Sequence, residues 1–426
     1  MISNEMKMKL SKWRRWGILA VLSMGGGIIY ILPYLSCYFY IPMKEAMHLN
    51  NTQLGLMGSA LGIAAMILYW PGGWVADRFS PRKLVTLSLS AVGLLGLWMA
   101  TFPPFKILIV IQLLMGVFTT LTFWSAMIKA TRQLGSSTEQ GRFFGFLEAG
   151  RNLITVVVVA GALALFAKMG SNAIGLRWAI ILLSVGVFII ALLSWFSISD
   201  QQEVAQEESS DDKEQVPLWE GITRVVKLPA VWMVMLIILS AYVTSVGITY
   251  ITPYATDVYK QSVVFGGLLY TIMEWTSIFA SPVAGFIADR ITTSKATIYS
   301  FIILVLSWSI FVFVKGGASL YYVLLVNSIV IGCTIYGLRG IYYALLEEGA
   351  IPRILTGTAT GLISFIAYTP DVFIPYVAGR LLDKYPGGLG YKYFFLILAL
   401  FSVFGLILTV IFRKTVSVSG TEKPVA

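Results

Sequence analysis

Long apolar blocks separated by short polar stretches run along this chain. Twelve of the blocks reach roughly 20 residues, the length that a helix needs to cross about 30 Å of hydrocarbon. Alternating segments of about ten residues, the pattern of membrane strands, are absent from the sequence. Because a helix satisfies its own backbone hydrogen bonds in lipid, we predict an all-α membrane protein. The predicted helices cover residues 16–42, 53–76, 84–102, 107–129, 142–168, 175–198, 229–256, 264–288, 296–315, 320–343, 355–382 and 391–413.

The composition supports a lipid environment. The chain of 426 residues is 57% hydrophobic and only 12% charged, whereas soluble domains carry about 25% charged residues. A soluble core cannot hide that much apolar surface. The first span is too long for a removable signal peptide and lacks a small-residue cleavage site, so we expect it to stay in the membrane.

A polar segment divides the chain. Residues 199–217 are acidic and poor in apolar side chains, which is typical of a solvated linker. The residues that follow resemble a short interfacial helix, which ends where Pro229 opens the next span. We therefore expect an N-terminal six-helix bundle over 1–198 and a cytoplasmic linker over 199–228. A C-terminal six-helix bundle with a short tail is expected over 229–426.

The two halves repeat each other at two places. GIIYILPY at residues 27–34 returns as GITYITPY at 247–254, and GWVADR at 73–78 returns as GFIADR at 285–290. The matches occur in the same order and at equivalent places in each half, which indicates a duplication.

The basic residues indicate an orientation. Twelve spans put both termini on one side, and most of the 31 Lys and Arg residues fall in cytoplasmic segments when that side is cytoplasmic. The tail residues Lys7, Lys9, Lys12, Arg14 and Arg15 dominate this bias. The net charge of +10 therefore reports membrane orientation, and nucleic-acid binding is not expected. The short loops favour a bacterial inner membrane, and we expect a monomer.

Few residues suit metal or enzyme chemistry. Cys37 and Cys333 lie inside predicted spans, so neither a disulfide framework nor a metal site is indicated. His48 is the only histidine and lies in the first outer loop, which argues against a His-based dyad or proton relay. We expect no cofactor and no enzyme activity.

The loop between the second and third spans carries a family motif. It reads GWVADRFSPRK over residues 73–83 and resembles the G-x-x-x-D-R-x-G-R-R/K loop of the major facilitator superfamily of secondary transporters. A degenerate copy occupies residues 285–295. The acid of the motif can accept hydrogen bonds from a neighbouring helix N-terminus, and its basic residues can pair with acids across the cytoplasmic face. The resemblance implies gating roles for Asp77, Arg78, Arg82, Lys83, Asp289 and Arg290.

This resemblance covers the whole chain and implies two pseudo-symmetric six-helix bundles that rock about a site at the membrane midplane. Residues 124–153 and 356–383 resemble the bacterial sugar-phosphate permease grouping, which includes organophosphate:phosphate antiporters and organic anion carriers. Those antiporters pair arginines on the first and seventh spans, where this chain carries tyrosines, so phosphate exchange is disfavoured. The fifth span lacks the Gly-Pro pair of drug:proton antiporters, and the sixth lacks the PESPR-like end of sugar porters.

Ionisable residues inside the spans are the candidate binding groups. Each costs roughly 2.5 to 3.5 kcal/mol at mid-bilayer unless it has a partner or a wet cavity. Arg151 lies in the fifth span with Glu148 one turn before it, so the guanidinium could bind an anion or form a structural pair with Glu148. Glu274 and Asp371, near the middle of the eighth and eleventh spans, could couple transport to protons or form structural pairs.

Further polar residues complete the expected site. Asn152 and Tyr368 could add hydrogen bonds beside the charged groups, or could satisfy a neighbouring helix. Arg339 lies near the cytoplasmic end of the tenth span and is interpreted as a gating or snorkelling residue. Tyr38 is assigned to a packing stripe or aromatic belt near the outer surface.

The repeated tyrosines give the sharpest structural prediction. Tyr30 and Tyr34 are four residues apart, as are Tyr250 and Tyr254, so each pair lies on one helix face. The resemblance implies that the first and seventh spans face each other across the central cavity, so all four tyrosines are expected to line it. The proline in each copy of the repeat predicts a helix bend at matching depth.

We predict a secondary active transporter, a symporter or an antiporter, that moves a small organic anion such as a sugar phosphate or uronate. The alternative is a proton-coupled transporter of a neutral sugar or nucleoside, because aromatic side chains suit stacking on a ring. A membrane receptor or enzyme that borrowed the fold is the remaining reading. The expected partners are the substrate, a coupling proton or ion, and the lipid bilayer.

Overall fold

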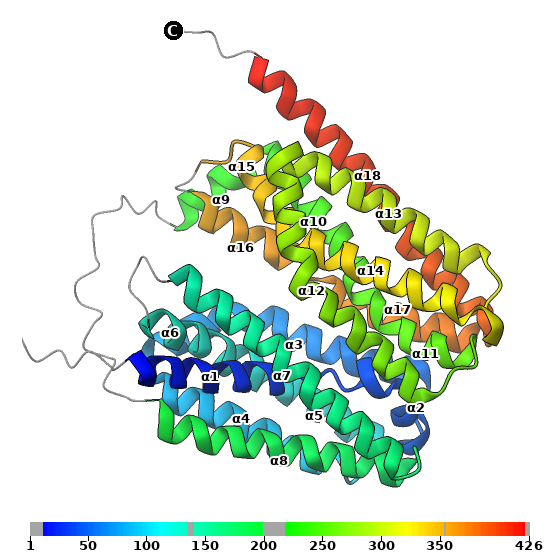
Figure 1. Ribbon diagram of the computed structural model, residues 1–426. Coiled ribbons are helices and arrows are strands. Elements are labelled where there is room, and N and C mark those ends of the chain that lie inside the picture. Colours follow the sequence, from blue (N-terminus) through cyan, green and yellow to red (C-terminus); the bar gives the residue numbers. More distant parts are fainter. Residues whose placement is uncertain (1–11, 135–139, 199–217, 353–354, 422–426) are drawn as a thin grey trace, which may run out of the picture.

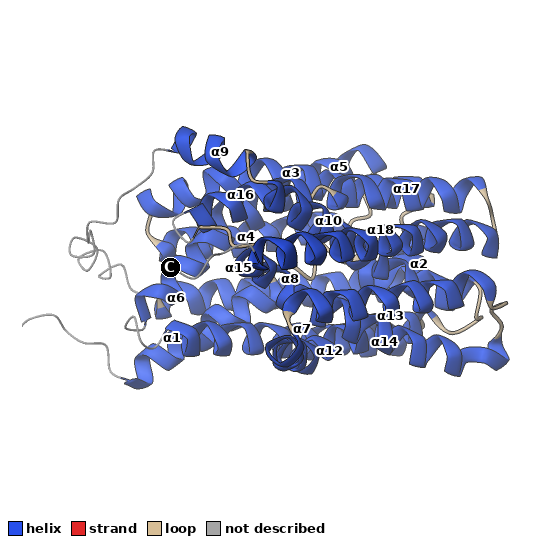
Figure 2. Cartoon of the chain, turned by 90° about the horizontal axis from the view of Figure 1, so that it is seen from above, coloured by secondary structure: helices blue, strands red, loops and turns tan. Residues whose placement is uncertain are grey.

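The computed structural model describes residues 12–134, 140–198, 218–352 and 355–421. Figure 2 shows that these residues form helices joined by loops. Eleven helical segments among them are long and apolar enough to cross a membrane. The predicted basic residues ahead of position 12 and residues 199–217 of the predicted linker over 199–228 lie outside the described residues.

The N-terminal half contains α1 (Lys12–Ile28), α2 (Ser36–Ala46), α3 (Asn51–Arg78), α4 (Pro81–Met99), α5 (Phe105–Gly116), the π-helical segment η1 (Val117–Trp124), α6 (Ser125–Leu134), α7 (Gln140–Lys168) and α8 (Ala173–Ser197). The short helix α9 (Leu218–Val226) precedes the C-terminal half. That half contains α10 (Pro229–Gly247), η3 (Ile248–Tyr250), α11 (Ile251–Asp257), α12 (Val263–Ile291), α13 (Thr293–Phe313), η4 (Ala318–Leu320), α14 (Tyr321–Ile341), η5 (Tyr342–Ala344), α15 (Leu345–Glu348), α16 (Thr356–Ala367), α17 (Pro370–Lys384) and α18 (Gly388–Thr421).

The first span is broken, which is why it is not among the eleven. The backbone leaves the helix between α1 and α2, and Pro33 lies in this break. Gln112 from α5 donates to the freed carbonyl of Pro33 at 3.1 Å. In the second copy of the repeat the chain only tightens into η3 and resumes as α11, which holds Pro253. The first copy therefore leaves the helix around its proline, whereas the second changes only to a single 3₁₀ turn that ends before Pro253.

Figure 1 shows the two halves as two bundles that approach each other at the end carrying α2 and α11. There α3 packs along α17, and α12 contacts both α2 and α7. Glycines allow the close approach: a Cβ on Gly55 would lie 2.2 Å from the carbonyl oxygen of Pro375, and one on Gly62 would lie 2.5 Å from that of Asp371. We call this the closed end of the molecule.

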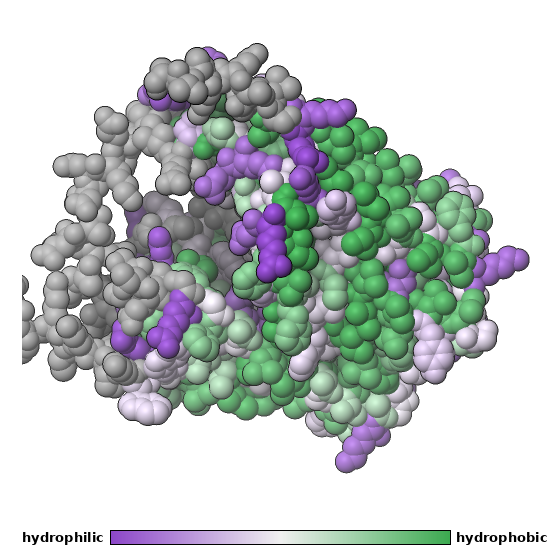
Figure 3. Space-filling model, turned by 45° about the horizontal axis from the view of Figure 1, so that its top comes forward, coloured by the Kyte–Doolittle hydropathy of each residue, from purple (hydrophilic) through white to green (hydrophobic). Residues whose placement is uncertain are grey.

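Hydrophobic side chains cover most of the face seen in Figure 3, while hydrophilic ones gather mainly toward the end opposite the closed one. Large apolar side chains such as Phe286, Phe313 and Phe196 are 72%, 78% and 75% exposed. Exposure on this scale is expected where lipid rather than water surrounds a helix bundle.

Candidate functional site

A cavity of about 820 Å³ lies between the two halves. One wall comes from α1, α2, η1 and α7, and the other from α10, α12, α14 and α17. Of the residues predicted to bind substrate, the lining includes Tyr30, Tyr34, Glu148, Arg151, Asn152, Glu274 and Asp371.

The cavity opens away from the closed end. The α7 residues that line the cavity come mainly from the part of the helix nearer Gln140. In the part nearer Lys168, Leu163 packs beside Gly267 of α12 and leaves no cavity lining. Glu148 lies near the start of α7 and lines the cavity, yet its side chain is 59% accessible to water. We call this the open end; it carries the start of α1 and the end of α3.

Arg151 lies on the N-terminal wall, where neighbouring residues hold its side chain in position. Its Nη1 donates to Glu148 Oε2 at 2.7 Å, and its guanidinium lies 5.1 Å from the Trp124 ring and 5.8 Å from the Tyr30 ring. A Cβ on Gly26 would lie 2.7 Å from the Arg151 Cδ, so the absence of a side chain there makes room for the arginine. Arg151 therefore both pairs with Glu148 and lines the cavity.

The π-helical segment η1 positions two of the aromatic side chains around this arginine. It lies between α5 and α6 in the middle of the fourth span and ends at Trp124. The hydroxyl of Tyr30 donates to the Thr119 carbonyl within it at 3.4 Å. Such π segments replace the regular hydrogen-bond ladder and are frequent at functional sites.

Arg339 faces the same cavity from the C-terminal wall. Its Nη1 donates to Ser245 Oγ at 3.3 Å, and its guanidinium lies 5.8 Å from the rings of both Tyr242 and Tyr336. Among the described residues no carboxylate lies within ion-pair distance of it. The prediction had Arg339 near the end of the tenth span. Arg339 does lie in the last turn of α14, which ends at Ile341 and is followed by η5 and α15. It also lines the cavity, and its gating role stays a prediction.

The two acids of the C-terminal half each accept a tyrosine hydroxyl. Tyr38 donates to Glu274 Oε2 and Tyr242 donates to Asp371 Oδ2, both at 2.8 Å. Arg339 attracts both carboxylates electrostatically. The placement of Tyr38 in an outer belt is wrong: this residue is buried between the halves, where α2 inserts against α12.

Tyr250 and Tyr254 correct the prediction from the repeat, because neither lines the large cavity. Tyr254 is buried among aromatic rings, and its hydroxyl donates to the Phe311 carbonyl at 3.3 Å. Since the seventh span stays nearly helical, its polar stripe Tyr242, Ser245 and Thr249 faces the cavity and the repeated tyrosines point to α17 and α18. In the first span the break between α1 and α2 interrupts the helical period, so Tyr30 and Tyr34 can both line the cavity.

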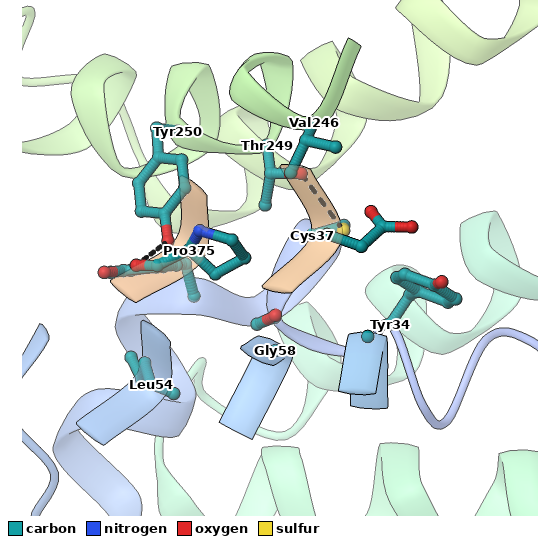
Figure 4. A pocket seen from close by; sticks show the side chains of 12 residues that line it. Tyr34, Cys37, Leu54, Gly58, Val246, Thr249, Tyr250 and Pro375 are labelled. Atoms are coloured by element: carbon teal, nitrogen blue, oxygen red, sulfur yellow. Dashed lines mark hydrogen bonds between the residues drawn. The ribbon is translucent and has the colours of Figure 1, made fainter. Parts of the chain in front are cut away.

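Tyr250 instead lines a second, small cavity of about 50 Å³ on the closed side of the large one. Figure 4 shows its hydroxyl directed at the Pro375 carbonyl, which accepts its hydrogen bond at 2.9 Å. Cys37 lies near Thr249 across the same space, with Sγ and Oγ1 3.5 Å apart. The small cavity continues the large one toward the closed end, because the two share the lining residues Tyr34, Cys37, Val246, Thr249 and Asp371.

Tyr368 stands behind the cavity wall. It is not a lining residue, but its hydroxyl lies 3.1 Å from that of Tyr343 and 3.4 Å from that of Tyr342, which both line the cavity. Of the two predicted roles for Tyr368, the structure shows the hydrogen bonds to a neighbouring segment, whereas the Asp371 carboxylate accepts from the Tyr242 hydroxyl.

The residues predicted to gate from the loop motif and its degenerate copy lie at the open end. Arg78 stacks over the Trp74 ring and Arg82 over the Trp195 ring, each at 4.0 Å. Lys83, Asp289 and Arg290 are exposed, and the side chain of Asp77 is outside what the structure describes.

Several cavity residues were missed from the sequence: Trp124, Tyr242, Tyr270, Tyr336, Tyr342 and Tyr343. The spacing of Tyr242, Ser245 and Thr249 on an otherwise apolar helix is a signal that could have identified this helix as part of the C-terminal wall of the cavity. Trp124 carried no such signal, because the π-helical segment that orients it does not follow the ordinary helical period.

A helical membrane protein whose two halves enclose a large polar, charged cavity belongs to the class that carries small solutes across membranes. The sequence profile of the Major Facilitator Superfamily matches residues 17–375, and the chain belongs to this family of transporters.

Individual relatives agree with this assignment. The chain is 32% identical to the inner membrane protein YqcE of Escherichia coli, over 90% of this chain and 91% of that one. It is 30% identical to the inner membrane protein YihN of the same organism, over 95% and 96% of the two chains. A phosphoglycerate transporter protein of Salmonella typhimurium is 22% identical over 76% of this chain and 74% of its own length.

Solved structures show the same fold. A bacterial homologue of the human lysosomal transporter Spinster, in an inward-facing and unoccupied conformation, superposes with a TM-score of 0.75 at 12% identity, over 95% of this chain and 98% of that one. The nucleoside transporter NupG superposes with a TM-score of 0.71 at 16% identity, over 94% and 98% of the chains. The predicted twelve-helix facilitator fold in two pseudo-symmetric bundles is confirmed.

Proposed function

We propose that this protein is a secondary active transporter that moves a small organic anion, such as a sugar phosphate or a uronate, by alternating access. The observation that carries the proposal is Arg339, which faces the central cavity with no carboxylate at ion-pair distance among the described residues. A cation inside a membrane protein is costly unless a partner compensates it. A carboxylate, phosphate or sulfonate on the substrate supplies that partner and accepts two parallel hydrogen bonds from the guanidinium.

Arg151 extends the argument to the other half. It reaches the same cavity from α7, so an anion held between Arg151 and Arg339 contacts both bundles at once. Binding of this kind depends on how the bundles sit relative to each other, which is the differential affinity that alternating access needs. The tyrosine and serine hydroxyls around the arginines suit a hydroxylated substrate.

A proton-coupled carrier of a neutral sugar or nucleoside is the second candidate. It is favoured by Glu274 and Asp371, two carboxyl groups that face the cavity and accept hydrogen bonds from tyrosines. Such carboxyl groups can bind a coupling proton, and the aromatic lining can stack on a ring. The two candidates differ in whether binding requires the arginines.

The orientation is part of the same proposal. We infer that the open end and both termini face the cytoplasm of a bacterial inner membrane. The distribution of Lys and Arg residues supports this direction. The relatives YqcE and YihN are inner membrane proteins.

Thermal stabilisation of the detergent-purified protein tests the proposal. The panel contains sugar phosphates, uronates, sulfonates, nitrate and neutral sugars. An anion is expected to raise the unfolding temperature of the wild type and of Arg413→Gln, whose exposed arginine lies in the C-terminal part of α18 and does not line the cavity. The same anion is expected to have little effect on Arg339→Gln. Stabilisation by a neutral sugar that persists in Arg339→Gln and Arg151→Gln overturns the anion proposal and favours the second candidate.

A further inference from the structure

The N-terminus of α3 depends on the opposite half of the protein. The first four backbone N–H groups of a helix have no partner within it and must be satisfied elsewhere. Asn50 and Gln53 satisfy two of them reciprocally: the Asn50 side chain accepts from the Gln53 backbone at 2.8 Å, and the Gln53 side chain accepts from the Asn50 backbone at 2.9 Å. The backbone N–H groups of Asn51 and Thr52 are left over.

Asp383, at the end of α17 in the C-terminal half, accepts both of these. Its Oδ1 accepts from the Asn51 backbone at 3.1 Å, and its Oδ2 accepts from the Thr52 backbone at 2.7 Å. The side chains of the same two residues add donors, with Asn51 Nδ2 at 2.8 Å from Oδ1 and Thr52 Oγ1 at 2.5 Å from Oδ2. One carboxylate thus receives four hydrogen bonds at the positive end of a long helix.

The surrounding contacts fix this arrangement. A Cβ on Gly379, one turn before Asp383, would lie 2.3 Å from the Asn51 carbonyl oxygen, so only glycine lets the helices meet here. Tyr40 of α2 donates to Asn51 Oδ1 at 3.3 Å and orients that side chain. The cluster lies at the closed end, where the two bundles approach each other (Figure 1).

We propose that Asp383 is a latch that holds this end of the transporter shut. Alternating access requires the closed end to open, and opening separates α3 from α17. Asp383 is exposed to water even in the closed arrangement, so the latch acts through its hydrogen bonds. Separation breaks all four of them together, which favours the closed arrangement over the opened one. The inference concerns the family's conformational cycle and is independent of which substrate is carried.

Spin-label distance measurements test the latch without any substrate. Labels are placed on Glu45→Cys, at the end of α2, and Leu389→Cys, at the start of α18, in a protein with Cys37→Ser and Cys333→Ser. Both label positions are exposed, and they belong to different halves at the closed end. The wild type is expected to give mainly a short distance, and Asp383→Asn is expected to raise the population with a long distance about fivefold, because the carboxylate is exposed to solvent.

Asp257→Asn is the matched control. Asp257 accepts from the Tyr391 hydroxyl at 2.6 Å, and both residues belong to the C-terminal half, so the same substitution there should leave the distances unchanged. Thr52→Val removes one of the four donors and should raise the population with a long distance by a smaller factor than Asp383→Asn does. This variant keeps the test available if Asp383→Asn does not fold. Distances that are the same in the wild type and in both latch variants overturn the proposal.

Discussion

Replacing Glu148 with glutamine is expected to strengthen anion binding rather than weaken it. In the structure the carboxylate of Glu148 already occupies Arg151, with Oε2 2.7 Å from Nη1. An incoming anion therefore competes with Glu148 for the same guanidinium. Glutamine keeps the size of the side chain and removes the charge, so Arg151 becomes available at lower cost.

The magnitude follows from the exposure of the pair. A hydrogen bond between charged groups contributes about 1.5 to 3 kcal/mol when protected, and an exposed ion pair about 0.2 to 1 kcal/mol. The Glu148 and Arg151 side chains are 59% and 15% accessible, which places the pair between these limits. About 1 kcal/mol is a reasonable value, and it corresponds to roughly a fivefold decrease in the dissociation constant for the anion.

Calorimetric titration at fixed salt measures this change. The anion that best stabilises the wild type is titrated into Glu148→Gln, Arg151→Gln and the double variant, with Glu45→Gln as a control for loss of an exposed carboxylate. Because Glu148 acts through Arg151, its substitution is expected to have no effect once Arg151 is glutamine. If Glu148→Gln weakens binding as much as Arg151→Gln does, the competition is refuted and Glu148 contacts the substrate instead.

Three further outcomes are expected. Glu274→Gln or Asp371→Asn abolishes accumulation driven by a proton gradient in proteoliposomes but spares exchange of substrate for substrate; accumulation that survives both changes excludes coupling at these groups. Gly27→Ala, whose Cβ would lie 2.5 Å from the Arg151 carbonyl oxygen, lowers the unfolding temperature and weakens anion binding, whereas Gly17→Ala, which meets open space, does neither. Tyr254→Ala costs about 3 to 5 kcal/mol of stability, because aromatic packing is lost. Tyr254→Phe retains anion binding, and a loss of binding in this variant contradicts the position of Tyr254 outside the cavity.

The hydrophobic pattern predicted the spans well, because the bilayer imposes one length and one secondary structure on them. It also led to Arg151 and Glu148. A charge deep in a span and a partner one turn away are both visible in the sequence, and the structure brings them to the cavity together.

The repeat was less reliable for individual side chains. Tyr34 and Tyr254 occupy the same position in the two copies, yet Tyr34 is 40% exposed and lines the cavity while Tyr254 is 2% exposed in an aromatic core. The difference arises from the backbone, since the first span breaks around Pro33 and the seventh does not. A duplicated sequence therefore does not guarantee a duplicated environment.

Contacts between the halves could not be predicted at all. The hydrogen bonds from Tyr38 to Glu274 and from Thr52 to Asp383 join residues more than 200 positions apart, and they depend on which end of the transporter is closed. Arg339 shows the same limit, because its distance from the end of a span says little about the face on which it lies.

The most direct test of the central claim compares matched pairs of ligands, each an anionic sugar derivative and its neutral parent, by thermal stabilisation of the purified protein. Anchoring by Arg339 predicts that only an anionic member stabilises the wild type, and that this effect is kept in Arg413→Gln and lost in Arg339→Gln. A neutral parent that stabilises the wild type and Arg339→Gln alike would contradict it.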